Sequence, residues 1–261
     1  MLHNHEMPNY MLIGVRKGAT SWIWKQLDKH PDIETHPNKE IHFFNKFYHK
    51  GISWYKKQFK WSKKVIIDTT PDYFEETCAE RIKNHFPKIR MMVSLRNPIE
   101  RAFSHFKFSK FLNAKKSNFK ILWKQNWQQI RTRGLYDKHL YCFYDRFPKQ
   151  NLLVMFHDDI KISSENFSNN IYDYMNVPRI KGEFRDMRWM PGENTCWTKI
   201  EGQKKDYEKR YEKYKEYHKK EILNNDDFKM MCDYYEEPIK NLEKIVNRDF
   251  SNWLKIENIE C

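Results

Sequence analysis

A segment near the start of the chain places basic residues and glycines between an apolar run and a helix. Residues 14–21 read GVRKGATS, after a strand expected at 10–15 and before a helix expected from Ser21. A strand, a turn and a helix N-terminus in this order gather backbone N–H groups, which favours the binding of an anion. Lys17 adds a positive charge and Ser21 a hydroxyl donor. Taken alone, the pattern is explained equally well by a helix cap at Ser21 and a turn at Gly18.

The position of Lys17 separates this segment from the phosphate-binding loop of nucleotide hydrolases. Their pattern, GxxxxGK[ST], has the lysine directly after the second glycine, whereas Lys17 precedes Gly18. Asp68, at the end of the apolar run KVIID, is the only candidate for a carboxylate that holds Mg²⁺. The segment therefore indicates an anion site and disfavours a nucleotide hydrolase.

A second candidate anion site lies in the stretch SLRNPIERAFSHF at 94–106. Arg96 ends a buried strand, and Ser104 lies on the helix that follows it. In a parallel sheet both sites are expected at the carboxyl edge of the strands, where ligands bind. Two such sites suit a nucleotide that carries two separate anionic groups. For Arg101, three residues before Ser104, we expect a pair with Glu100 or with an exposed acid instead of an anion ligand.

Strands and helices alternate along the first two thirds of the chain. Strands are expected at 10–15, 64–68, 89–95 and 151–156, and helices at 21–30, 75–86, from Ile99, at 135–147 and at 164–175. Alternation of this kind predicts an α/β fold with a central parallel sheet, a P-loop-like strand-loop-helix and helices on both faces. Residues 178–261 lack strand signals, so we expect a helical C-terminal extension within one domain spanning 1–261.

Composition narrows the partners and the compartment. The net charge of +13 over 261 residues favours anionic partners: nucleic acid, acidic glycans, nucleotide phosphates or an anionic membrane surface, without a choice among them. No stretch approaches the roughly 20 apolar residues of a membrane span, and the start of the chain has no signal-peptide pattern. The five cysteines are scattered and odd in number, which indicates free thiols. These features predict a cytoplasmic protein.

Several motifs, in order, resemble sulfotransferases that use 3′-phosphoadenosine 5′-phosphosulfate, and in particular the N- and O-sulfating heparan sulfate enzymes. The motifs are IGVRKGATS, HPDIETHPNKEIHFFNKFYHKGISWY, TTPDYF, LRNPIERAFSHF, RGLYDKHLYCFYDRFPKQNLLVMFHDDI and NLEKIVNRDFSNWL. They cover roughly 10–178 and the C-terminal helix. One such motif is weak, but several in order are specific.

The resemblance implies a role for each matching residue. Lys17 matches the lysine that stabilises the leaving group, Glu40 the general base, and His42 a histidine of the O-sulfating members. The nucleotide ligands implied are Arg16, Lys17, Gly18, Ala19, Thr20 and Ser21 at the 5′-phosphosulfate, and Arg96 and Ser104 at the 3′-phosphate. Thr69, Asp72 and Tyr73 are candidates for contacts with the acceptor. No metal is implied, because Lys17 and the loop amides supply the positive field.

Glu40 and His42 also have ordinary explanations when they are read without the motifs. Glu40 is then a solvated loop carboxylate beside Lys39, and His42 a half-buried aromatic residue next to Phe43. If the segment is extended, the side chains of Glu40 and His42 lie on the same face, as a base and its helper require.

The chain departs from the family pattern in three places. Thr69 stands where the family has a lysine that helps with glycan acceptors. Cys196 matches the first cysteine of a disulfide-bounded loop, but no second cysteine follows at short spacing; Lys199, Lys204 and Lys205 are substitutes for the basic segment there. The membrane anchor of the secretory enzymes is missing, which suggests a cytosolic, microbial or viral relative.

The sequence leaves the acceptor and two other function classes open. A hydroxyl on a carbohydrate is the expected acceptor, with no specific nucleic acid and no membrane span. The alternatives are a non-catalytic protein that binds nucleotides or an anionic polymer, and a P-loop-like kinase that needs Mg²⁺. A lysine- and tyrosine-rich helix expected at 202–223 is either a surface helix or a basic wall beside the acceptor.

Overall fold

The computed structural model describes residues 7–113, 118–180 and 223–255. The chain divides into two compact units. The sheet unit comprises Met1–Leu95 and Cys142–Cys196, and the helical unit comprises Arg96–Tyr141 and Trp197–Cys261. The expected helix at 202–223, apart from its last residue, and the lysines named beside Cys196 lie outside the described residues.

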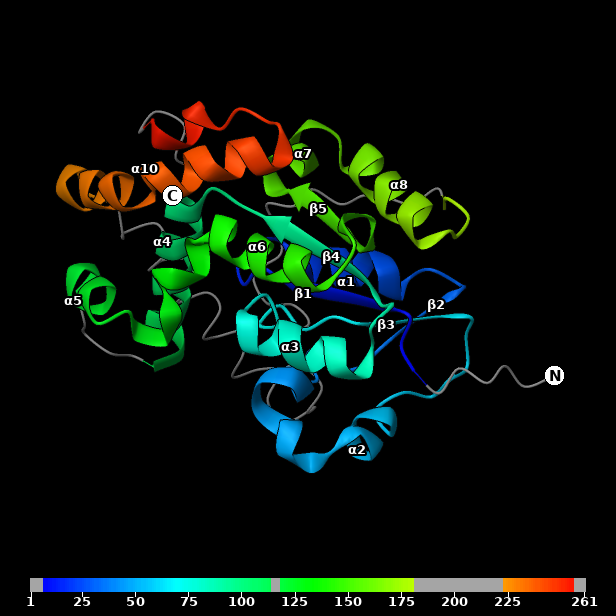
Figure 1. Cartoon of the computed structure of the whole chain (residues 1–261). Helices are drawn as coiled ribbons and strands as arrows, with labels where there is room; N and C mark the ends of the chain where they lie inside the picture. The colour runs from blue at the N-terminus through cyan, green and yellow to red at the C-terminus, as the bar shows by residue number, and fades with distance from the viewer. Residues whose placement is uncertain (1–6, 114–117, 181–222, 256–261) are drawn as a thin grey trace. The chain divides into compact units, whose positions relative to one another are not determined.

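The sheet unit contains a five-stranded sheet in the order β2-β3-β1-β4-β5 (Figure 1). The strands are β1 (Tyr10–Gly14), β2 (Ile33–Thr35), β3 (Val65–Asp68), β4 (Arg90–Leu95) and β5 (Leu152–Phe156). Every neighbouring pair is parallel. The predicted α/β fold and its four strands are confirmed, whereas β2 was missed because three residues give too short a pattern to detect.

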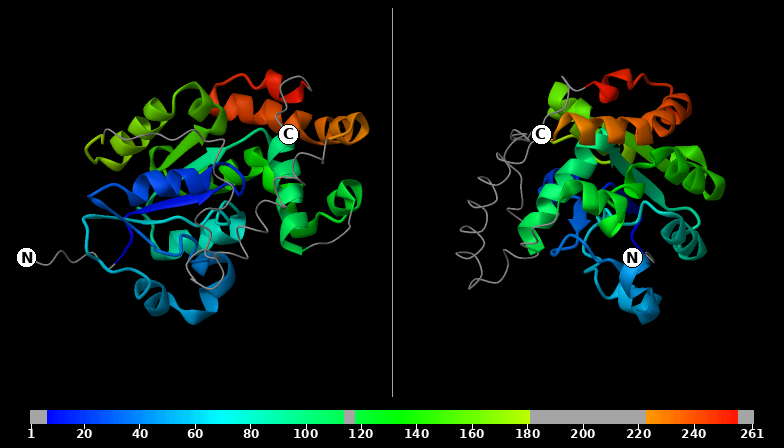
Figure 2. Two further views of the ribbon diagram at one scale, coloured as in Figure 1. Left: turned by 180° about the vertical axis from the view of Figure 1, so that it is seen from behind. Right: turned by 90° about the vertical axis from the view of Figure 1, so that its left-hand side faces the viewer.

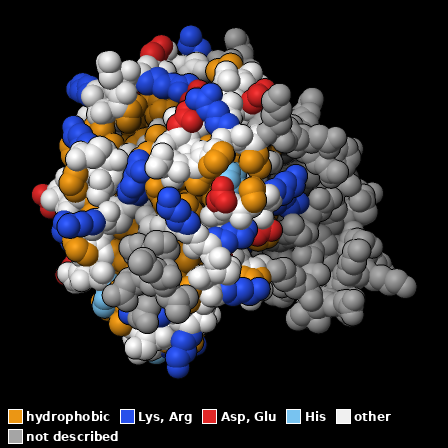
Figure 3. Space-filling model, turned by 90° about the vertical axis from the view of Figure 1, so that its right-hand side faces the viewer, with side chains coloured by type: hydrophobic (Ala, Val, Ile, Leu, Met, Phe, Trp, Pro, Cys, Tyr) orange, Lys and Arg blue, Asp and Glu red, His pale blue; other side chains and the backbone are white. Residues whose placement is uncertain are grey.

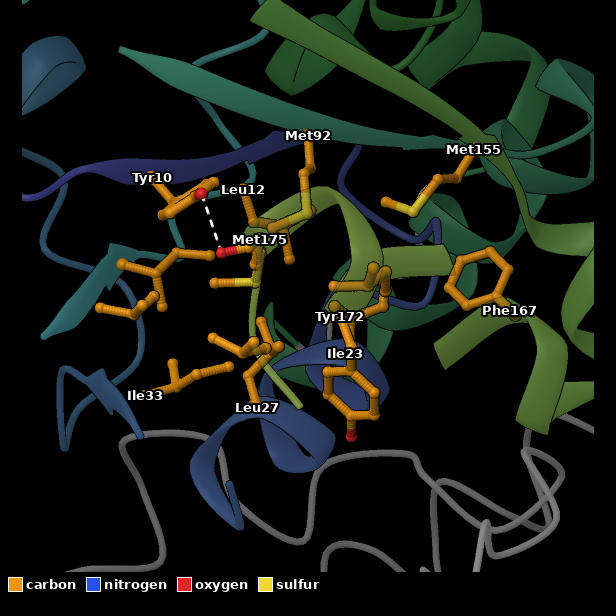
Figure 4. Packing of buried hydrophobic residues seen from close by; sticks show 14 of the residues in the cluster. Tyr10, Leu12, Ile23, Leu27, Ile33, Met92, Met155, Phe167, Tyr172 and Met175 are labelled. Carbon is orange, nitrogen blue, oxygen red and sulfur yellow. Dashed lines mark hydrogen bonds between the residues drawn. The ribbon is translucent and has the colours of Figure 1, made fainter. Parts of the chain in front are cut away.

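Alternate residues of the strands face opposite layers of helices. On one face, α1 (Thr20–Asp28) and α8 (Ser164–Met175) pack over Tyr10 and Leu12 of β1, while α3 (Glu76–His85) lies on the other face (Figures 1 and 2). Figure 4 shows the first layer, in which the Tyr10 hydroxyl donates to the Met175 carbonyl oxygen at 2.9 Å. This bond ties the end of α8 to the first strand.

Short helices complete the sheet unit. They are a π-helix η1 (Phe43–Phe47), η2 (Tyr48–Lys50), α2 (Ile52–Lys56), η5 (Lys149–Asn151) and α7 (His157–Ile162). None of these short helices was predicted from the sequence. Aromatic side chains hold the π-helix in place, because Phe43 stacks on Tyr55 at 4.7 Å and Phe44 meets Tyr73 edge to face at 5.3 Å between ring centroids.

The helical unit is described by itself. It contains α4 (Pro98–Asn113), α5 (Phe119–Lys124), η3 (Trp127–Gln129), η4 (Thr132–Gly134), α10 (Asn225–Val246) and η8 (Ser251–Leu254). Helix α6 (Tyr136–Arg146) begins in this unit and ends in the sheet unit. Tyr235 of α10 donates its hydroxyl to the Arg131 carbonyl oxygen at 2.7 Å. The described C-terminal part is thus helical, as predicted.

Two absences apply only to the residues that the structure describes. No helix there is long and apolar enough to cross a membrane. No three His, Cys, Asp or Glu side chains there are grouped as metal ligands would be. The cysteines in these ranges, Cys78, Cys142 and Cys232, are free thiols.

Candidate active site

The loop after β1 is shaped by backbone contacts with β4. The Val15 N–H donates to the Ser94 carbonyl oxygen at 3.1 Å, and the Gly18 N–H donates to the Val15 carbonyl oxygen at 2.9 Å. A Cβ atom on Gly18 would stand 2.3 Å from that same Ser94 oxygen. Glycine at position 18 is therefore required by close approach to the strand, and its amide is used within the turn.

Left-handed residues alternate with this glycine at the entrance to α1. Lys17 has φ 72° and Ala19 has φ 65°. Ala19 is the N-cap of α1 and has no capping side chain, so the interpretation of Ser21 as the N-cap is wrong. Thr20 and Ser21 instead occupy the first turn, where N–H groups have no acceptor within the helix. The loop keeps the local form of an anion site.

Glu40 and His42 meet, but not through an extended segment. Lys39 and His42 both have positive φ, 61° and 57°, and the Glu40 N–H donates to the Asn38 carbonyl oxygen at 2.7 Å. The conditional prediction of an extended segment is therefore wrong. The turn nevertheless brings His42 Nε2 to 3.1 Å from Glu40 Oε2. The two side chains to which the resemblance assigns the base and its helper are thus in contact, and their roles stay a prediction.

Lys39 is the other partner of Glu40. Its Nζ lies 2.9 Å from Glu40 Oε1, and the Glu40 side chain is 30% exposed. Burial by itself would raise the pKa of Glu40, but Lys39 and then His42 outweigh it and hold that pKa well below its usual value. Glu40 is therefore a carboxylate at neutral pH, the form that can accept a proton.

A fully buried carboxylate lies behind this segment. Asp68, at the end of β3, accepts hydrogen bonds from the hydroxyls of Thr70 at 2.7 Å, Tyr55 at 2.9 Å and Tyr73 at 3.1 Å. Burial raises the pKa of Asp68 to about 6, although the three hydroxyl donors oppose this effect. These four residues are called the Asp68 cluster below. Both oxygens of Asp68 are engaged inside the protein, which argues against the Mg²⁺-binding role considered for it.

The Asp68 cluster holds the backbone that follows Glu40. Thr70 Oγ1 accepts from the N–H groups of Ile41 at 3.0 Å and His42 at 3.4 Å. The Tyr73 hydroxyl accepts from the Phe43 N–H at 2.8 Å. Three consecutive amides are thus anchored to β3 and the turn after it. This arrangement was not predicted from the sequence, although an acid at a strand end followed by two threonines is a visible signal.

The three candidates for acceptor contacts are all buried. Thr69 donates its hydroxyl to the Lys39 carbonyl oxygen at 3.1 Å, and Tyr73 is part of the Asp68 cluster. Asp72 pairs with Arg16 through both carboxylate oxygens, one of them 3.0 Å from Nε, and its Oδ2 lies 3.9 Å from His42 Nδ1. In this structure these side chains support Lys39, Arg16 and His42. Their contact with an acceptor stays a prediction.

Arg96 and Ser104 belong to the helical unit. Arg96 directly follows β4, and its Nε and Nη2 bind one carboxylate oxygen of Glu100 at 2.9 and 2.8 Å. The proposed pairing of Arg101 with Glu100 is therefore wrong: Arg101 is fully buried and donates to the Ile130 carbonyl oxygen. Ser104 is half-buried on α4. The assignment of Arg96 and Ser104 to a 3′-phosphate stays a prediction.

Comparison with known proteins identifies the family of this chain. The model of the sulfotransferase domain matches residues 7–245, which include most of both units. The chain belongs to the sulfotransferase family. The match covers the loop at 14–21, the Glu40 turn and the Asp68 cluster, so the geometry described above is that of a family member.

Individual relatives of the chain are also sulfotransferases by name. The chain is 27% identical to mouse heparan sulfate glucosamine 3-O-sulfotransferase 3B1, over 76% of this chain and 53% of that one. It is 30% identical to human heparan sulfate glucosamine 3-O-sulfotransferase 5, over 58% and 48%. With the membrane-associated sulfotransferase kil1 of Dictyostelium discoideum the identity is 36%, over 40% and 23%. The matches span about half, or less, of these relatives' length.

Solved structures confirm the fold. A sulfotransferase from Alicyclobacillus acidocaldarius superposes with a TM-score of 0.73 at 18% identity, over 95% of this chain and 99% of that one. Mouse sulfotransferase SULT7A1, solved in complex with PAP, gives a TM-score of 0.55 at 14% identity, over 93% and 89%. At these identities the likeness concerns the arrangement of helices and strands.

Proposed function

We propose that the protein transfers a sulfuryl group from 3′-phosphoadenosine 5′-phosphosulfate to a hydroxyl group of a carbohydrate, with Glu40 as general base. The observation that carries the proposal is the position of Glu40. Its carboxylate is linked to His42 on one side and, through Lys39, to the hydroxyls of Thr20 and Ser21 on the other. A base connected to an anion-binding loop is what in-line transfer to a hydroxyl requires.

The loop at 14–21 fits a phosphosulfate group. Lys17 and Ala19 in the left-handed region, together with the first turn of α1, form the kind of backbone concavity that binds anions. In this proposal Lys17 and the amides of Ala19, Thr20 and Ser21 hold the 5′ end, and Arg96 and Ser104 hold the 3′-phosphate. The Gly18 amide is assigned to the turn instead, because it donates to Val15.

The bound nucleotide supplies a sulfuryl group attached to a phosphate leaving group. Glu40 accepts the proton of the acceptor hydroxyl while the acceptor oxygen bonds to sulfur. Lys17 places its positive charge where negative charge develops on the leaving oxygen. His42 holds the Glu40 carboxylate through Oε2 and so fixes the direction in which the base faces.

A carbohydrate acceptor is supported by the relatives whose names describe sulfation of heparan sulfate glucosamine. The basic surface is consistent with an anionic glycan, since Lys and Arg side chains are spread over the described part of the face in Figure 3. Thr69 in place of the family lysine leaves the acceptor side with one cation fewer. Neutral and anionic glycans are therefore both part of the test.

The test combines a titration with a turnover assay. The protein is titrated calorimetrically with adenosine 3′,5′-bisphosphate without metal, and with ATP and Mg²⁺ as the control. Sulfuryl transfer is then measured with the labelled donor and a panel of heparan sulfate, desulfated heparan and neutral glycans. We expect tight bisphosphate binding without Mg²⁺ and transfer to at least one glycan.

Three other outcomes would redirect the proposal. Binding of the bisphosphate or a polyanion without any transfer would support a non-catalytic binding protein. Phosphate release from ATP that needs Mg²⁺ would support a kinase-like or hydrolase activity. Failure to bind the bisphosphate at all would overturn the assignment of the 14–21 loop.

A further inference from the structure

Lys39 is a buried cation with an unusual set of neighbours. Its side chain is 7% exposed, and its Nζ lies 2.9 Å from Glu40 Oε1, 3.1 Å from Ser21 Oγ and 3.5 Å from Thr20 Oγ1. An ammonium group has three donor protons, so these three acceptors match its full capacity. Lys39 therefore contacts the base and the first turn of α1 at the same time.

The backbone of Lys39 is held by hydrogen bonds at both its N–H and its carbonyl group. Its N–H donates to the His36 carbonyl oxygen at 2.9 Å, and its own carbonyl oxygen accepts from Thr69 Oγ1 at 3.1 Å. Its φ of 61° is one that residues other than glycine rarely adopt. Contacts on both sides of the peptide hold this conformation, which indicates a defined position for the ammonium group.

We propose that Lys39 is a positioning residue shared between Glu40 and the anion in the 14–21 loop, so that occupancy of the loop and the charge on Glu40 are coupled. The inference rests on the proposed function, because it takes the loop to be the 5′-phosphate site. An anion beside Thr20 and Ser21 attracts the Lys39 ammonium away from Glu40. The carboxylate is then held less strongly and becomes a better base at the moment the donor is bound.

The charge on Glu40 should also affect anion binding in the 14–21 loop through Lys39, because coupling between two sites is reciprocal. When Glu40 carries its negative charge, it neutralises part of the Lys39 charge that the loop anion would otherwise feel. Removal of the Glu40 charge should therefore strengthen anion binding, and only while Lys39 is present. The other charged groups nearby are His42 beside Glu40 and the Asp72–Arg16 pair beside His42. Substitutions at Lys39 and Glu40 leave these groups in place.

A double-mutant cycle on the full chain tests this coupling without any turnover. Adenosine 3′,5′-bisphosphate affinity is measured for the wild type, Glu40→Gln, Lys39→Met and the double variant, with Lys88→Met as an exposed control. We expect Glu40→Gln to bind the bisphosphate about fivefold or more tightly than the wild type, and this gain to vanish in the Lys39→Met background. Lys39→Arg, which keeps the charge, should keep the gain.

The possible outcomes distinguish a failure of the Lys39 proposal from a failure of the proposed function. An unchanged affinity of Glu40→Gln, or a gain that survives in Lys39→Met, would overturn the sharing of Lys39. If Lys39→Met does not fold, the comparison of Glu40→Gln with the wild type and with Glu80→Gln, an exposed neutralisation on α3, still tests it. A wild type that does not bind the bisphosphate defeats the proposed function instead, so the two failures are distinguishable.

A turnover measurement gives a second readout that a purely structural role of Lys39 would not change. In Lys39→Met the acid limb of the kcat/KM profile should move to higher pH by about 1–3 units, because Glu40 loses its nearest cation. Lys39→Arg should restore the wild-type profile. A lower rate with an unshifted profile would show that Lys39 serves only the fold.

Discussion

The two segments that the proposal joins, the 14–21 loop and the Glu40–Phe43 turn, are held in their positions by different means. The loop depends on its own backbone: left-handed residues at Lys17 and Ala19, and a glycine pressed against β4. The Glu40–Phe43 turn depends on residues about 30 positions later, because Thr70 and Tyr73 accept its amides. One site is local in the sequence, and the other exists only after β3 is in place.

Because of this difference, substitutions in the two segments should have different effects. Changes in the loop should act on anion binding and on the fit against β4. Changes around Glu40 should act on proton transfer and on the pH dependence of stability, with little loss of nucleotide affinity. Two of the described side chains contact both segments: Lys39 contacts Ser21 and Glu40, and Asp72 pairs with Arg16 and lies 3.9 Å from His42 Nδ1.

The largest effect is expected from Glu40→Gln. Loss of the general base should lower kcat by about 100- to 10,000-fold, while bisphosphate binding stays at least as tight as in the wild type. Single-turnover rates and calorimetry measure the two quantities, and Glu80→Gln is the control. Equal losses of rate and of nucleotide affinity would show that the two segments are not separable.

Lys17→Ala should rank second. Removal of the cation assigned to the leaving oxygen is expected to lower kcat by about 100- to 1,000-fold. In contrast to Glu40→Gln, it should also weaken bisphosphate binding, because Lys17 belongs to the loop itself. The same assays apply, with Lys88→Ala as the exposed control. Wild-type kinetics in Lys17→Ala would remove its assigned role.

The Asp68 cluster predicts a particular pH dependence of stability. The folded pKa of Asp68, about 6, lies above its ordinary value of 3.8, so its stabilising contribution is complete below 3.8 and is lost as pH rises through 6. Relative to Asp68→Asn, the wild type should therefore lose about 2 kcal/mol of unfolding free energy between pH 4 and 7. Urea unfolding at several pH values measures the difference, and Asp32→Asn on the surface should show no such trend. A difference that grows in the opposite direction would contradict the raised pKa.

The smallest effect is expected from the glycine of the loop. A Cβ on Gly18 meets the backbone oxygen of Ser94, which has no room to yield, so Gly18→Ala should destabilise the fold by about 2 kcal/mol and weaken bisphosphate binding. Gly51→Ala is the matched control: it has a φ of 76° but open space around it, and should cost about 1 kcal/mol without touching nucleotide affinity. Equal behaviour of both variants in binding would refute the close-approach argument.

Several features of the fold and the site could be predicted from the sequence because their causes are local. Apolar runs at β1, β3, β4 and β5 and the alternation with helices gave the parallel sheet. The order GVRKGATS predicted a strand-loop-helix, and the resemblance of ordered motifs predicted the family. Short elements were missed for the same reason: β2 and the π-helix at 43–47 have too few residues to carry a period.

The arrangement around Glu40 was decided only by the tertiary structure. An extended segment would have placed Glu40 and His42 on one face, whereas in the structure a turn with positive φ at Lys39 and His42 brings the pair together. Positive φ in these residues persists because the distant hydroxyls of Thr69, Thr70 and Tyr73 hold the neighbouring peptides. Periodicity reports which side chains face a core, but it does not report which distant hydroxyl will meet which amide. The sequence by itself thus specified the sheet, the strand-loop-helix at 14–21 and the family, while the partners of Glu40 were fixed by contacts across the fold.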